Sequence, residues 1–142
     1  MTDLAKGIVE INGYEIKPQT NPIDVENNLK GSYAYHVVSK NGKVHIFTFK
    51  NINVFDRRFD IDVTFVRQSL STIELASCYG EDLSYVGRFK ADCEWLKNVL
   101  GEPTQAGTNG VVYKFDSAQI GVTLWENDGR SGSNEIVQIS YC

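Results

Sequence analysis

Residues 58–65, RFDIDVTF, alternate between polar and apolar side chains without a break. A period of two is typical of a β-strand that buries one face and exposes the other to water. The two sets of side chains are Phe59, Ile61, Val63 and Phe65 on the apolar face, and Asp60, Asp62 and Thr64 on the polar face. We therefore expect a sheet with a core on one side and water on the other.

The neighbouring residues extend this strand into an antiparallel run. The stretch 33–50, YAYHVVSKNGKVHIFTFK, carries Asn41-Gly42 near its centre, a pair that favours a two-residue hairpin turn. The stretch 71–78, STIELASC, has the composition of a further strand. Together with 58–68, these stretches predict about four antiparallel strands.

The residues before this run predict a small hairpin and a short helix. Asn12-Gly13 lies between two alternating segments and favours a two-residue turn. A short helix is predicted over 20–31, because Thr20 or Asn21 can cap its start and Pro22 suits its first turn.

A second, longer helix is predicted to end at residue 100. Phe89, Cys93, Leu96 and Leu100 follow one another at spacings of four, three and four, so they line one face of a helix. Gly101 stands where a left-handed residue ends a helix. Cys93 therefore reads as a small packed side chain rather than a reactive thiol.

Three more strands are predicted in 111–115, 119–127 and 134–142. The whole chain reads as one α+β domain, 1–142, in which two helices pack on an antiparallel sheet of about seven to nine strands. The order of a helix followed by strands occurs twice, in 19–78 and in 82–142.

The composition of the chain argues against several classes of function. A chain of 142 residues with 42% hydrophobic side chains can bury a core without disulfides, and a net charge of −4 with scattered Lys and Arg argues against a nucleic-acid partner. We find no signal peptide and no stretch of roughly 20 apolar residues, so we expect no membrane association. The odd set of Cys78, Cys93 and Cys142 fits neither a disulfide framework nor a metal clip. We therefore expect free thiols, a cytoplasmic location and no cofactor or metal.

Two histidines are the first candidates for chemistry. In the predicted hairpin, His36 and His45 share a face with Phe47 and Phe49. The four side chains can line a ligand pocket, and the two imidazoles can ligate a metal or act as acid and base. Half-exposed strand residues without a chemical role are the simplest interpretation, because the spacing matches no ligand motif. The opposite face of this hairpin, with Val44 and Ile46, is also apolar. The hairpin is therefore either covered by layers on both sides or exposes its phenylalanines, beside His36, His45 and Lys43, as a partner surface.

Acidic side chains offer a second kind of site. A row of aspartates on a rigid strand normally faces water, but it can also meet a basic partner with little loss of entropy. The loop at 126–135 adds further acids after a tryptophan, and it matches neither a calcium loop nor a phosphate loop. The candidate partner-binding residues are Asp56, Asp60, Asp62, Trp125, Glu126 and Asp128. Tyr33 and Tyr35 are further candidate anchors.

Catalytic patterns are missing from the sequence. No Gly-x-Ser-x-Gly occurs, and no cysteine is paired with a base by its spacing. We therefore predict no catalytic residue and no enzymatic activity.

The order of helix, strands, helix, strands resembles the layout of β-lactamase-inhibitor-like proteins and of small bacterial immunity proteins that neutralise toxins. The likeness covers the chain from Thr20 onward and is carried by the helix ends NLKG (28–31) and VLGEP (99–103) and by the strands that follow them. It is a likeness of layout, so it assigns no functional residue. The resemblance implies a non-enzymatic protein that occludes another protein, for example a basic toxin domain. A small-molecule module with the histidine pocket, or a His-dependent hydrolase or nuclease, are the alternatives.

Overall fold

The computed structural model describes residues 1–78, 85–123 and 136–141. Its helices are η1 (Leu4–Lys6, a 3-10 turn), α1 (Pro22–Asn28) and α2 (Tyr85–Leu100). Its strands are β1 (Val9–Ile11), β2 (Tyr14–Ile16), β3 (Tyr35–Val38), β4 (Val44–Val54), β5 (Arg57–Val66), β6 (Ser69–Ser77), β7 (Gln105–Gly107), β8 (Gly110–Lys114), β9 (Ala118–Thr123) and β10 (Val137–Tyr141).

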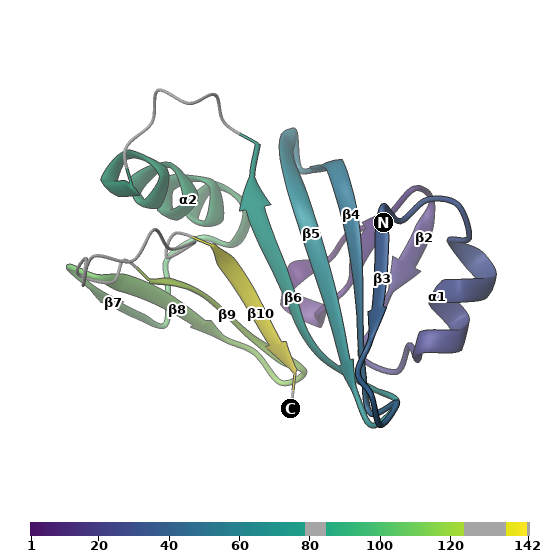
Figure 1. The fold of residues 1–142 in the computed structure, drawn as a ribbon. Helices are drawn as coiled ribbons and strands as arrows, with labels where there is room; N and C mark the ends of the chain where they lie inside the picture. The colour runs from purple at the N-terminus through teal and green to yellow at the C-terminus, as the bar shows by residue number, and fades with distance from the viewer. Residues whose placement is uncertain (79–84, 124–135, 142) are drawn as a thin grey trace.

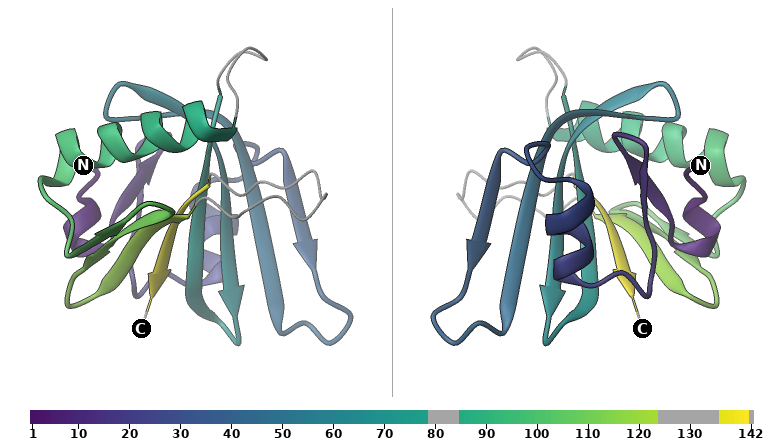
Figure 2. Two further views of the ribbon diagram at one scale, coloured as in Figure 1. Left: turned by 90° about the vertical axis from the view of Figure 1, so that its left-hand side faces the viewer. Right: turned by 90° about the vertical axis from the view of Figure 1, so that its right-hand side faces the viewer.

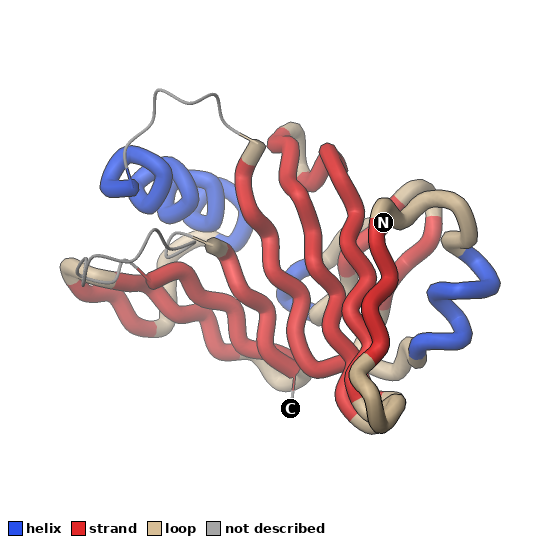
Figure 3. The backbone as a smooth tube through the Cα atoms, in the orientation of Figure 1, coloured by secondary structure: helices blue, strands red, loops and turns tan. Residues whose placement is uncertain are grey.

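Eight strands form one antiparallel sheet in the order β3-β4-β5-β6-β10-β9-β8-β7, and β1 pairs with β2 in a separate hairpin (Figure 1). The strands follow one another along the sheet except at β6, which pairs with the last strand, β10. Figure 3 shows these strands as one continuous and strongly twisted surface. The α+β class and the large antiparallel sheet predicted from the sequence are confirmed.

One face of the sheet carries the core. The pairing places His36, Phe47, Val63, Ile73, Ile139, Ile120 and Tyr113 in a single row across seven strands. Phe59, Ile61, Val63 and Phe65 are fully buried on this face, as their alternation predicts. At about 25 cal/mol per Å² of apolar area removed from water, this continuous core is the main stabilising contribution to the fold.

The described helices and the β1–β2 hairpin all cover that core face. In the right-hand view of Figure 2, α1 and the hairpin lie in front of the strands. The hairpin is joined to the far half of the sheet, because the Tyr141 hydroxyl donates a 2.9 Å hydrogen bond to the Gly7 carbonyl. Gly7 has a φ of 71°, and an added Cβ would lie 2.9 Å from the Tyr141 ring, so only glycine suits this contact.

Short-range signals explain α1 and the hairpin turns. Asn21 and Asp24 form a reciprocal capping box at the start of α1, next to Pro22. Asn12 and its following glycine both have positive φ, which is the turn predicted for β1–β2. At the β3–β4 turn, Gly42 has a positive φ but Asn41 does not. Ser39 still pairs with Val44, the first residue of β4, through a 2.9 Å backbone hydrogen bond.

Helix α2 is held to the sheet at its C-terminal end. Gly101, at φ 83°, donates a backbone hydrogen bond to the Lys97 carbonyl and ends the helix, as predicted. The Tyr113 hydroxyl on β8 donates to the Gly101 carbonyl at 2.8 Å. Leu96 is fully buried, whereas Cys93 is half-buried, so the thiol packs at the margin of the core rather than at its centre.

Candidate functional site

The open face is the side of the eight-stranded sheet opposite the core, and its central side chains are polar. The pairing sets Thr48, Asp62, Glu74 and Gln138 side by side across β4, β5, β6 and β10. The next row is Ile46, Thr64, Thr72 and Ser140. None of the described helices lies on this face (Figure 2). In the first row Gln138 is exposed and the other three side chains are half-buried.

Asp62 and Glu74 are the centre of the open face. They are direct cross-strand neighbours on β5 and β6. Asp62 accepts a 2.7 Å hydrogen bond from the Thr48 hydroxyl. Partial burial, and then the charge of Asp62, raises the pKa of Glu74. Within residues 1–78, 85–123 and 136–141, no cation lies within ion-pair distance of either carboxylate, so a positive charge brought here would stabilise both.

Asp60 lies on the same face but is already engaged. It accepts hydrogen bonds from the Asn51 backbone at 3.0 Å and from the Cys78 thiol at 3.4 Å, and it pairs with Lys50 at 3.5 Å. Burial acts to raise the pKa of this carboxyl, but the Asn51, Cys78 and Lys50 contacts outweigh it, so the pKa is lowered. Asp60 therefore contributes less free charge to the open face than Asp62 does.

Asp56, another predicted partner-binding residue, lies apart from the Asp62–Glu74 pair. Asp56 is exposed in the β4–β5 turn, beyond the end of the sheet, with a left-handed φ of 63°. Trp125, Glu126 and Asp128 lie outside the described residues. The structure thus brings together Asp60 and Asp62 from the predicted set, and adds Glu74, which the sequence pattern did not single out.

An apolar strip borders the open face at strand β3. Tyr35 is 62% exposed and Val37 59% on this face, and Val38 is 45% exposed on the opposite face. Strand β3 is an edge of the sheet, and no described strand pairs with its outer side. Phe47 and Phe49 point to the other face and are fully buried. The predicted exposed strip of Phe47 and Phe49 is therefore wrong, because both side chains are buried in the core. Cover on both faces does not hold in full either, because Tyr35 and Val37 on the opposite face are exposed.

The two histidines form a chain of contacts on the core side of β3. Nε2 of His36 lies 3.0 Å from Nδ1 of His45, and Nδ1 of His36 lies 3.5 Å from a carboxylate oxygen of Glu26 on α1. The His36 ring stacks on Phe47 with centroids 4.0 Å apart. Burial lowers the pKa of His36, the Glu26 charge raises it and His45 lowers it, with a net decrease. His36, His45 and Phe47 of the predicted ligand pocket are thus in contact, Phe49 is fully buried two residues further along β4, and a ligand there stays a prediction.

A buried ion pair was not anticipated from the sequence. Nη2 of Arg57 on β5 lies 2.6 Å from Oδ1 of Asp92 on α2, and Nη1 donates to the Ala91 carbonyl at 2.8 Å. Asp92 is fully buried, and the guanidinium lies over the rings of Phe59 and Trp95. The sequence feature that could have revealed this pair is Asp92, an acidic residue within the apolar stripe of the predicted helix. The ion pair joins α2 to β5, and this position indicates a structural role for the pair. A shallow cavity of about 430 Å³ lies beside it.

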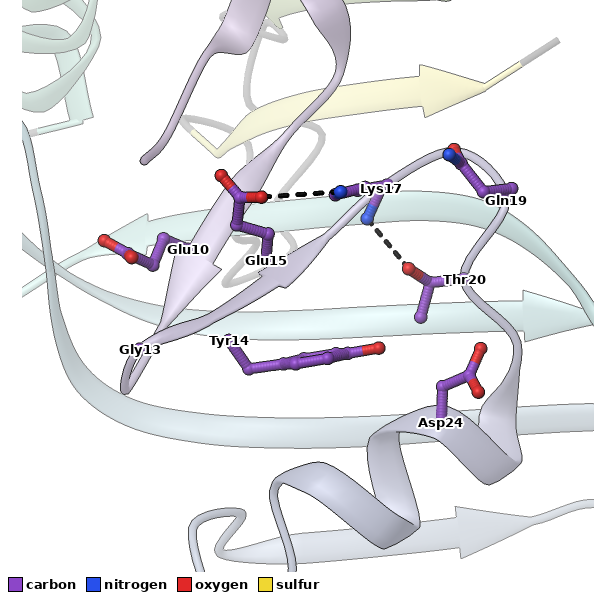
Figure 4. Close-up of a pocket in the computed structure, with 8 residues that line it drawn as sticks. All are labelled: Glu10, Gly13, Tyr14, Glu15, Lys17, Gln19, Thr20 and Asp24. Carbon is purple, nitrogen blue, oxygen red and sulfur yellow. Dashed lines mark hydrogen bonds and ion pairs between the residues drawn. The ribbon is translucent and has the colours of Figure 1, made fainter.

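A second cavity, of about 530 Å³, lies between the β1–β2 hairpin and α1 (Figure 4). Tyr14 forms one side, and Glu10, Glu15 and Asp24 surround it. These carboxylates have partners: Glu15 pairs with the N-terminal ammonium and with Lys17, Glu10 pairs with the same ammonium at 3.6 Å, and Asp24 caps α1. The carboxylates around this cavity are therefore already paired or hydrogen-bonded within the protein, so the cavity is not a candidate cation site.

The described residues show no metal centre and no membrane-spanning helix. Among residues 1–78, 85–123 and 136–141, no cluster of three or more His, Cys, Asp or Glu side chains is arranged to hold a metal ion. In the same ranges, no helix is both long and apolar enough to cross a bilayer. Burial raises the pKa of the Cys78 and Cys93 thiols, which disfavours the reactive thiolate.

No family model, curated protein or solved structure matches this chain.

Proposed function

We propose that this chain is a non-enzymatic binding protein that occludes a basic surface of another protein with the open face of its sheet. The observation that carries the proposal is the pair of adjacent carboxylates, Asp62 and Glu74, which lack a described cationic partner. Such a pair gains more from a basic partner than a neutralised surface does, since each cation relieves repulsion as well as forming a new contact.

The apolar strip at β3 supports the same proposal. Tyr35 and Val37 are more than half exposed and lie on the same face as Asp62. A partly apolar patch with aromatic anchors beside charged residues is the usual anatomy of a protein interface. The cytoplasmic location, the immunity role and the twofold order of helix and strands remain parts of this proposal. They rest on the layout resemblance and on the sequence.

A partner-capture experiment tests this function. The tagged protein is incubated with a lysate of the source organism, and retained proteins are identified by mass spectrometry. Asp62→Lys should abolish retention of the partner, because it places a positive charge at the centre of the open face. Asp116→Lys makes the same charge change at an exposed residue of the β8–β9 turn and should retain it.

Two results would contradict the proposal. One is that the wild type retains no protein above the level of an unrelated bait. The other is that Asp62→Lys, shown to be folded by circular dichroism, retains the same protein as Asp116→Lys.

The second candidate is a small-molecule module, favoured by the adjacency of Glu26, His36 and His45. A ligand bound there would have to displace the 3.0 Å contact between the imidazoles or bind to their exposed edges. A shift of the His36 and His45 ring signals on addition of a metabolite extract, without protein capture, would favour it.

A further inference from the structure

Strand β3 lacks the charges and prolines that usually protect a sheet edge. It contains no lysine, no proline and no charged residue, and three of its four side chains are large, apolar and at least 45% exposed. Natural edge strands are normally blocked by charges, prolines or bulges that prevent another strand from pairing. The opposite edge, β7, is three residues long and has no large apolar side chain. The two edges of the same sheet are thus protected to different degrees.

The backbone of β3 presents free pairing groups. Ser39 donates its backbone N–H to the Val44 carbonyl, and Arg67 donates its N–H to the Lys43 carbonyl. Because hydrogen bonds alternate along an antiparallel ladder, this register directs the backbone groups of Val37 toward β4 and those of His36 and Val38 outward. No described strand receives these outward groups.

The side chains on the two faces of β3 differ in chemistry. Tyr35 and Val37 offer an apolar surface on the open face. On the core side, the Glu26 carboxylate on α1 lies 3.5 Å from His36 and is 37% exposed. A strand added outside β3 would place alternate side chains beside each of these surfaces. The complementary sequence is one in which apolar residues alternate with lysine or arginine.

We propose that β3 is a strand-addition site that pairs with an extended segment of a partner protein in which apolar and basic residues alternate. This inference rests on the proposed protein-binding function and specifies how the partner is held. Backbone hydrogen bonds to His36 and Val38 supply affinity, and the contacts with Tyr35, Val37 and Glu26 select the sequence. A second copy of this chain matches less well, because the YHVV sequence of β3 carries no lysine or arginine to place beside Glu26.

The test uses three capped eight-residue peptides and backbone amide NMR of the whole protein. The first peptide alternates valine and lysine, the second alternates valine and glutamate, and the third has the composition of the first with the residues in pairs. We expect the valine–lysine peptide to shift the amide signals of His36 and Val38, and the other two peptides to leave them in place.

Variants separate strand pairing from general attraction. Val38→Pro removes an outward N–H without removing a hydrogen bond to β4, and should weaken binding about tenfold. Val38→Thr keeps the N–H and the branched shape, and should bind as the wild type does. Glu26→Gln should reduce the preference for the valine–lysine peptide over the valine–glutamate peptide.

Several results would overturn strand addition. They are equal binding of the lysine and glutamate peptides, unchanged binding by a folded Val38→Pro protein, amide shifts confined to other elements, and no shift with any peptide. A concentration-dependent dimer that Val38→Pro abolishes would assign the edge to a second copy instead. If a captured partner is lost by Asp62→Lys but kept by Val38→Pro, strand addition is wrong and the binding function stands. If no partner is captured but the valine–lysine peptide shifts the amide signals of β3, the proposed function is wrong and the strand-addition site is supported.

Discussion

Replacement of Asp92 by alanine should be among the most destabilising single changes in the described structure. The carboxylate is fully buried and lies 2.6 Å from the Arg57 guanidinium, which is 9% exposed. Its removal leaves a positive charge in the core beside Phe59 and Trp95, without the partner that compensated for its loss of hydration.

The magnitude follows from the loss of this buried carboxylate beside the guanidinium. Removal of one member of a buried ion pair costs about 3–5 kcal/mol, whereas a small domain is stabilised by only about 5–15 kcal/mol in total. For a chain of this size, the loss corresponds to a decrease in Tm of about 6–20 °C. Replacement of both partners by apolar residues, as in Arg57→Met with Asp92→Leu, should cost far less, because neither charge remains buried.

Urea unfolding followed by tryptophan fluorescence and circular dichroism measures these effects. Glu94→Ala is the matched control, since it removes an exposed acid two residues further along the same helix and should change stability by less than about 0.5 kcal/mol. A loss below about 1 kcal/mol for Asp92→Ala, or a double variant as unstable as the single one, would refute this interpretation of the pair.

Three further predictions concern the histidine contacts, the open face and α1. Because burial holds the pKa of His36 below its ordinary value of about 6.5, the unfolded chain binds that proton more readily, so stability should fall as the pH drops below about 6.5. Urea midpoints at several pH values should show this decrease in the wild type and a smaller one in His36→Gln; equal decreases would exclude His36 as the cause. Asp62→Asn should lower the raised pKa of Glu74 in a carboxyl NMR titration, since it removes a neighbouring negative charge, and an unchanged pKa would mean that burial acts alone. Asn21→Ala should cost about 1 kcal/mol in urea unfolding by removing the capping box of α1, and a change below about 0.3 kcal/mol would contradict that role.

Local sequence patterns were sufficient to predict much of the fold. The strand with Phe59 and Ile61, the Asn12-Gly13 turn and the helix end at Gly101 depend on residues close together in the sequence, and the structure confirms all three. The pairing of β6 with β10 depends on residues more than 60 positions apart, and no turn residue marks it. The short strand β7 was not predicted, because its three residues have no strand-like composition.

The candidate site was only partly predictable for the same reason. The alternation that put Asp60 and Asp62 on one face is local, so their shared position was foreseen. Glu74 joins them through strand pairing. The burial of Arg57 was not predicted, because it depends on the packing of α2 on β5. The apolar character of both faces of β3 was visible in the sequence, but its position at the sheet edge was not.

Capture of a partner by the wild type, Asp62→Lys and Asp116→Lys proteins is the most direct test of the central claim that the open face binds another protein. We predict that one protein is retained by the wild type and by Asp116→Lys, and that Asp62→Lys loses it while remaining folded. Retention of the same protein by all three, or by none of them, would contradict the claim.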